Sequence, residues 1–215
     1  SLYIVTLIWF LGHNRMGLGK FLKKFKTDKR IRIIKKFINK KCRILEIGVH
    51  EGALSKLLLK EFNPEVFYLV DPWKYQSEKL YKESLYGGNL SNLDGQKKLD
   101  TRYEKIKLNF KEQISSKQII LIRKNSDDIF NLVEDNFFDL IYIDGNHTFN
   151  FVKSDIINSL SKIRNDGVII CDDYGNPGWW NDGVTKAVDS LTKENYVKKI
   201  EIKSNQCVLK KLKTY

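Results

Sequence analysis

Short apolar runs alternate with segments of helical periodicity along most of the chain after residue 42. Uninterrupted apolar runs of this length are typical of strands buried on both faces of a parallel sheet. They predict strands over Arg43–Ile47, Val66–Val70, Gln118–Ile122, Phe138–Ile143 and Val168–Cys171. Two later segments, Tyr196–Ile202 and Gln206–Leu212, alternate apolar and polar residues and are predicted to pair as a hairpin.

Apolar residues at every third or fourth position predict the helices that separate these strands. The four sets are Leu54, Leu57, Leu58 and Phe62; Leu99, Tyr103, Ile106 and Phe110; Val152, Ile156, Leu160 and Ile163; and Val184, Ala187, Val188 and Leu191. A further short helix is expected from about Ser126. Regular alternation of strand and helix predicts an α/β fold with a doubly wound, mostly parallel sheet.

Positive charge is concentrated at the N-terminus of this 215-residue chain, which has a formal net charge of +12. Thirteen Lys and Arg residues and a single acidic residue, Asp28, lie between His13 and Arg43, whereas the remainder carries 25 basic and 25 acidic residues. We therefore divide the chain into an N-terminal arm of apolar and basic helices, residues 1–42, and a catalytic domain, residues 43–215.

Three roles stay open for the arm. Its opening apolar run, Leu2–Leu11, is about half a membrane span, and the basic residues that follow resemble the cytoplasmic flank of an anchor. Ordinary packing of amphipathic helices and contact with nucleic acid are the alternatives. The three cysteines lack metal-type spacing, so we expect buried free thiols in a reducing compartment, the cytoplasm, with association to a membrane surface left open.

Polar residues follow each predicted strand at the edge where α/β sheets bind ligands. Glu46, Gly48 and Gly52 surround the end of the first strand, where glycines let the backbone approach a ligand and a helix N-terminus offers N–H groups. A tight turn without a ligand is the alternative. Asp71 ends the second strand and can accept the hydroxyls of a ribose, or it simply starts a turn before Pro72.

The third, fourth and fifth strands end in further polar groups. Ser126 and Asp127 suit the rim of an adenine pocket, although Ser126 is also a typical helix cap. Asp144, Asp172 and Asp173 follow neighbouring strands, and clustered carboxylates are costly unless a cation neutralises them. All-oxygen ligands select a hard divalent ion, for which we expect Mg²⁺, with Mn²⁺ and Ca²⁺ as the alternatives. Asp172 and Asp173 can reach one ion together only if the backbone has already left the strand.

The pattern of Glu46, Gly48 and Gly52, followed by Asp71, Ser126-Asp127 and Asp144, resembles the class I S-adenosylmethionine-dependent methyltransferases. Within that superfamily, Ile143-Asp-Gly-Asn-His147, Asp172-Asp173-Tyr174 and Gly183-Val-x-x-Ala187-Val188 are similar to metal-dependent O-methyltransferases of the catechol and sugar types. The resemblance implies a Rossmann-like sheet of seven strands with a reversed last strand. It covers the chain from about Arg43, but not the arm and not most of Lys74–Ser116, where substrate choice would reside.

The resemblance also implies roles for the site residues. Glu46, Gly48 and Gly52 would hold the methionine end of S-adenosylmethionine, Asp71 its ribose, and Ser126 and Asp127 its adenine. Asp144 would border the donor and, with Asp172 and Asp173, bind the metal, while His147 would be the base. For His147, a purely structural role in the loop is the alternative.

We therefore predict an enzyme that methylates a hydroxyl group of a small molecule or sugar with the help of a divalent ion. Two rivals remain at this point. A nucleic-acid methyltransferase would explain the basic arm, but the rest of the chain is neutral and lacks a base-binding motif. The other rival is a non-catalytic binding protein on the same scaffold.

Overall fold

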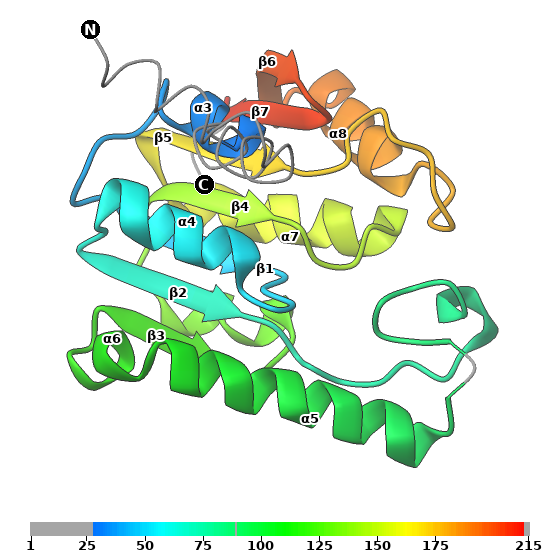
Figure 1. Cartoon of the computed structure of the whole chain (residues 1–215). Coiled ribbons are helices and arrows are strands. Elements are labelled where there is room, and N and C mark those ends of the chain that lie inside the picture. The colour runs from blue at the N-terminus through cyan, green and yellow to red at the C-terminus, as the bar shows by residue number, and fades with distance from the viewer. Residues whose placement is uncertain (1–27, 89, 213–215) are drawn as a thin grey trace, which may run out of the picture.

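A sheet of seven strands lies at the centre of the protein, whose computed structural model describes residues 28–88 and 90–212 (Figure 1). The strands are β1 (Arg43–Ile47), β2 (Val66–Val70), β3 (Ile119–Ile122), β4 (Phe138–Ile143), β5 (Ile163–Cys171), β6 (Val197–Lys203) and β7 (Gln206–Lys211). Their order across the sheet is β3-β2-β1-β4-β5-β7-β6. Only β7 runs antiparallel to its neighbours, β5 and β6. The Rossmann-like sheet with a reversed last strand is thus confirmed.

Helices cover both faces of this sheet (Figure 1). One face packs against α3 (Lys29–Ile34), α4 (Ala53–Phe62), α5 (Asn92–Asn109) and α6 (Lys111–Ser115), and the other against α7 (Phe149–Lys162) and α8 (Gly183–Lys193). Three short 3-10 helices, η1 (Lys79–Tyr81), η2 (Ser126–Asp128) and η3 (Phe130–Leu132), lie in the connections. Successive strand residues such as Ile44 and Leu45 are fully buried in the two opposite layers of the core. Burial on both faces explains why the central strands are uninterrupted apolar runs.

The strand limits predicted from the sequence agree closely with those of the structure for the central strands and less well elsewhere. β1, β2 and β4 begin and end where the apolar runs do. β5 begins at Ile163 rather than Val168, because Ile163 pairs with Phe138 through the backbone although residues 164–166 are exposed. The helix expected from Ser126 is the pair η2 and η3. All three cysteines are buried and unpaired, as predicted.

The described part of the arm packs on the catalytic domain. Ile31 and Ile34 of α3 are buried in the same core layer as residues of β1 and α4. Asp28 caps this helix by accepting hydrogen bonds from the backbone N–H and the guanidinium of Arg30. The first 27 residues of the predicted arm, which include the apolar run Leu2–Leu11, lie outside the described residues. Within residues 28–88 and 90–212, no helix is long and apolar enough to span a membrane.

Candidate active site

The carboxyl ends of the parallel strands are joined into one continuous edge. At each of four strand ends the next backbone N–H donates to a carbonyl of the neighbouring strand: Gly48 to Val70 (2.9 Å), Asp71 to Ile122 (3.2 Å), Asp144 to Ile47 (2.8 Å) and Asp172 to Ile143 (2.9 Å). β1 lies between β2 and β4, where the direction of winding changes. The predicted site residues of four strands therefore meet at the switch point, where α/β sheets bind ligands.

Gly48 is required by its contact with the chain that leaves β4. Its φ of 90° is a conformation that other residues rarely adopt, and a Cβ at this position would lie 2.1 Å from the carbonyl oxygen of Asp144. Gly52, with a φ of 72°, begins α4 and would meet Ile106 of α5 at 2.6 Å. The two glycines thus let the loop after β1 pass between the β4 loop and α5.

Glu46 is a buried carboxyl group beside this loop. It is 1% exposed, and burial raises its pKa to about 8, an effect that the nearby Ser55 hydroxyl and Arg30 guanidinium only partly offset. Ser55 lies close, yet neither its Oγ nor the Oε2 of Glu46 completes a hydrogen bond of normal geometry among the described residues. A buried oxygen without a partner fits a ligand that brings a positively charged donor, such as the amino group of a methionine moiety.

Asp71 is the most heavily hydrogen-bonded carboxylate of the site. Its Oδ2 accepts the backbone N–H groups of Val49 and His50, both at 3.0 Å, and the hydroxyl of Tyr86, while Oδ1 accepts the N–H of Trp73 at 2.7 Å. Burial raises the pKa of Asp71, and these four donors counteract the rise. Asp71 therefore fixes the loop after β1 at the end of β2.

Ser126 and Asp127 direct their side chains toward α7. The Ser126 hydroxyl donates to the buried carboxyl group of Asp155 at 2.5 Å. Asp127 Oδ1 accepts from Ser154 and Asn158, both at 2.9 Å. Any contact of this loop with an adenine would thus be made through its backbone in this arrangement, and the adenine role stays a prediction.

His147 lies between two of the predicted carboxylates. Its Nε2 is 3.5 Å from Asp144 Oδ1 and 3.6 Å from Asp173 Oδ2, and its side chain is 14% exposed. Burial lowers the pKa of His147, partly offset by Asp173 and Asp172, so the ring is neutral at pH 7. Burial and the neighbouring Asp172 raise the pKa of Asp144 well above its ordinary value. The three groups form an imidazole flanked by two carboxyls.

Asp172 lies near this group, but its Oδ1 is engaged by other hydrogen bonds. The backbone leaves the strand as expected, since Asp173 has a φ of 59°, and Asp172 Oδ1 accepts from the Asp173 N–H (2.9 Å) and from the side chain of Gln206 on β7. Gln206 in turn accepts the hydroxyl of the fully buried Tyr142. Within the described ranges no three His, Cys, Asp or Glu side chains are grouped closely enough to hold a metal ion. The predicted carboxylate set for Mg²⁺ is therefore not assembled among these residues.

Aromatic side chains stand beside His147. Its ring lies 4.9 Å from that of Trp180, at an interplanar angle of 35°, and Trp179 lies 5.5 Å from Tyr81 of η1. Asn146 donates to the Tyr81 hydroxyl at 3.0 Å. The Nε1 of Trp180 and the Nε2 of His147 are buried without a hydrogen-bond partner among the described residues. This arrangement suits an acceptor molecule that stacks and also forms hydrogen bonds. Trp73, by contrast, is fully buried in the core.

Fold and site together define a class I S-adenosylmethionine-dependent methyltransferase. The chain belongs to the family described as "Methyltransferase domain", whose model matches residues 45–174. The chain has no match among curated proteins.

Solved structures share the fold at low identity. A Staphylococcus aureus protein assigned as a caffeoyl-CoA O-methyltransferase is 16% identical, with 98% of this chain and 100% of that chain covered and a TM-score of 0.59. A Clostridium thermocellum protein assigned as an rRNA methylase is 10% identical, with 86% and 94% covered and a TM-score of 0.57. Cofactor-bound Rv0187 from MTB is 14% identical, with 80% and 73% covered and a TM-score of 0.56. These likenesses establish the fold alone.

Several residues of the site carry no signal in the sequence. Tyr86 bonds to Asp71 from a separate segment, and Gln206 bonds to Asp172 from the reversed strand. Asp155 lies among the apolar positions of the helix α7, where it is buried. An acidic residue at such a position is the sequence signal that could have indicated a role in the site. Their partners lie 15 to 34 positions away in sequence, so only the folded chain reveals them.

Proposed function

We propose that the enzyme transfers the methyl group of S-adenosylmethionine to a hydroxyl group of a small molecule or sugar, with His147 as the general base. The carrying observation is the position of His147, whose neutral ring is flanked by Asp144 and Asp173 at the switch point of the sheet. When bound, the donor supplies a methyl group on a positively charged sulfur, so the protein needs no covalent nucleophile.

The acceptor oxygen must lose its proton as it forms a bond to the methyl carbon and the carbon–sulfur bond breaks. His147 Nε2 is buried and has no hydrogen-bond partner among the described residues, so an acceptor hydroxyl that reaches it would find its lone pair unused. Once it takes the proton, the imidazolium has the carboxyls of Asp144 and Asp173 within 3.6 Å. The negative charge of Asp173, and of Asp172 nearby, favours the protonated ring and so assists the transfer.

Gly48, Glu46 and Asp71 are proposed to hold the donor. Glu46 offers an unpaired buried oxygen to the donor's amino group, and Gly48 brings the β1 loop against the chain that carries Asp144. The aromatic residues Trp179, Trp180 and Tyr81 are proposed to form a wall of the acceptor site. A ring-shaped acceptor with polar groups at its rim matches such a wall.

A requirement for Mg²⁺ remains a separate proposal. Its support is the concentration of negative charge around Asp144, which raises the pKa of that carboxyl and which a cation would relieve. Binding through Asp172 would require that side chain to leave Gln206.

The test is incubation with methyl-labelled donor and a panel of sugars, catechols and RNA, each with Mg²⁺ or with EDTA. Transfer to a small hydroxyl acceptor supports the proposal, whereas transfer to RNA alone contradicts it. Activity that persists undiminished in EDTA would refute the metal requirement while leaving methyl transfer in place. As a matched pair, Asp172→Asn tests the metal set, and Asp189→Asn, an exposed aspartate on α8, is the control.

A further inference from the structure

The hydrogen bonds of Asp71 leave no room for a ribose. A carboxylate accepts about four hydrogen bonds, and Asp71 already receives four, three of them on Oδ2. The residue is also only 1% exposed. A donor ribose can reach Asp71 only if one of the four present donors withdraws.

Tyr86 is the donor that can withdraw. The N–H groups of Val49, His50 and Trp73 belong to the backbone that shapes the loops after β1 and β2, so their loss would dismantle the site. The Tyr86 hydroxyl, in contrast, is at the end of a side chain, and a change of side-chain rotamer removes it. Its ring is 6.0 Å from that of His50, directly beside the same loop.

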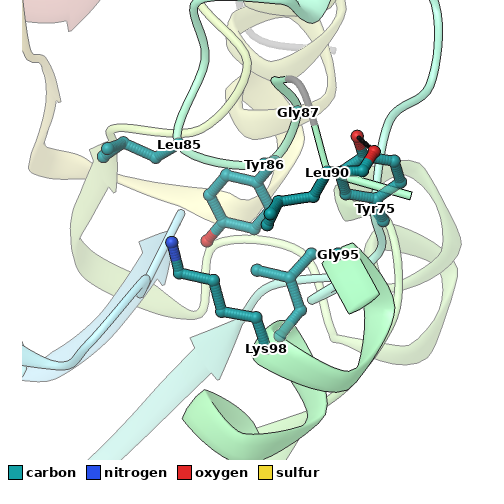
Figure 2. A pocket seen from close by; sticks show the side chains of 8 residues that line it. Tyr75, Leu85, Tyr86, Gly87, Leu90, Gly95 and Lys98 are labelled. Carbon is teal, nitrogen blue, oxygen red and sulfur yellow. Dashed lines mark hydrogen bonds between the residues drawn. The ribbon is translucent and has the colours of Figure 1, made fainter. Parts of the chain in front are cut away.

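The surroundings of Tyr86 permit such a movement. It lies in the connection between β2 and α5, which contains one short helix, η1, and is held by bonds such as Gln76 N–H to Tyr86 O (2.8 Å). Tyr86 also borders a small hollow between this connection and α5, partly open to solvent (Figure 2). Leu85 and Leu90, at the rim of the hollow, are 66% and 46% exposed. The hollow alone is too small for the ring, so displacement of the ring would also move these exposed side chains.

We propose that Tyr86 is a donor-site residue that occupies the ribose position in the ligand-free protein and releases Asp71 when S-adenosylmethionine binds. This inference rests on the proposed function of Asp71. The exchange is balanced, because a ribose O–H replaces the phenolic O–H on the same carboxylate oxygen. The ligand must compete with the protein's own side chain, so its apparent affinity is its intrinsic affinity multiplied by the fraction of molecules in which Tyr86 has withdrawn.

The test is calorimetric titration of the full chain with S-adenosylmethionine, comparing wild type, Tyr86→Phe and the control Tyr75→Phe. Tyr75 lies in the same connection, and its hydroxyl donates to the carbonyls of Gly88 (3.1 Å) and Leu90 (2.8 Å) rather than to Asp71. Removal of the Tyr86 hydroxyl is expected to tighten donor binding on the order of tenfold, because one charge-assisted bond no longer has to be broken. Tyr75→Phe should leave the affinity within about twofold of wild type.

Thermal unfolding of the same three proteins, with and without saturating donor, is a second measurement. Each variant is compared with itself, so a lower melting temperature of the variant alone does not affect the comparison. The rise in melting temperature caused by the donor should be largest for Tyr86→Phe. If wild type binds the donor and Tyr86→Phe binds it equally or more weakly, the inference is overturned while the proposed function stands. An equal gain in Tyr75→Phe would also overturn it, because general loosening would then be the cause. A wild-type protein that binds no donor overturns both.

Discussion

Substitution of Glu46 by Gln should make the empty protein more stable and less able to bind its donor. Glu46 is buried at the end of β1 with one oxygen unpaired, and its pKa is raised from 4.5 to about 8. In the unfolded chain the carboxyl loses its proton near its ordinary pKa, whereas in the folded protein it keeps the proton to about pH 8. Between these values the unfolded state binds fewer protons, so stability falls as pH rises.

The size of the effect follows from this difference. pH 7 is about 2.5 pH units above the unfolded pKa of 4.5, and the folded carboxyl is still mostly protonated there. At 1.36 kcal/mol per unit, ionisation therefore stabilises the unfolded state relative to the folded state by roughly 3 kcal/mol. Gln is neutral in both states and escapes this cost. Glu46→Gln should therefore exceed wild type in free energy of unfolding by about 3 kcal/mol at pH 7, and the two should converge near pH 4.5.

Urea unfolding of both proteins at several pH values measures this difference. The control is Glu61→Gln on α4, because Lys35 lowers the pKa of Glu61 by a hydrogen bond and this site should not gain stability on substitution. Calorimetry should show that Glu46→Gln has lost donor affinity, since Gln cannot ionise to meet a cationic amino group. Parallel pH curves for wild type and Glu46→Gln would refute the reasoning.

Three further expectations concern the same edge of the sheet. Gly48→Ala places a Cβ against the carbonyl of Asp144 at a positive φ, so it should destabilise the fold by more than about 2 kcal/mol in thermal unfolding, and a wild-type melting temperature would contradict this close contact. Gln206→Leu removes the donor to Asp172 and should cost about 1–3 kcal/mol in urea unfolding; an unchanged midpoint would show that the bond is dispensable. The activity of wild type should persist at pH 6.5 and fall only at lower pH, because burial lowers the pKa of His147 and the ring stays a neutral base below the pH at which a free imidazole is half protonated; a kcat/KM profile already halved above pH 6.5 would contradict this.

The sequence predicts the sheet well because its central strands are buried on both faces. β1 and β4 are mostly apolar runs, and Gly48 and Asp144, which directly follow them, lie at the ligand-binding edge. The start of β5 is not visible in the pattern, since Arg164 and Asp166 are exposed and only backbone pairing extends the strand. Apolar patterning reports burial, and it does not report hydrogen bonds made by exposed residues.

The same limit applies to the side chains of the site. Asp144, His147 and Asp173 come together as the strand order requires. Asp172 also lies near this group, yet its Oδ1 is engaged by Gln206 from the reversed strand. Which way a side chain points at a strand end depends on partners far along the chain, and a single sequence does not identify them.

The central claim, that His147 accepts the proton of the acceptor hydroxyl, is tested most directly by single-turnover transfer of labelled methyl in wild type and His147→Gln at saturating donor. We predict that the variant binds S-adenosylmethionine as wild type does and transfers the methyl group at least about 100-fold more slowly. A variant that transfers methyl at the wild-type rate would contradict the account.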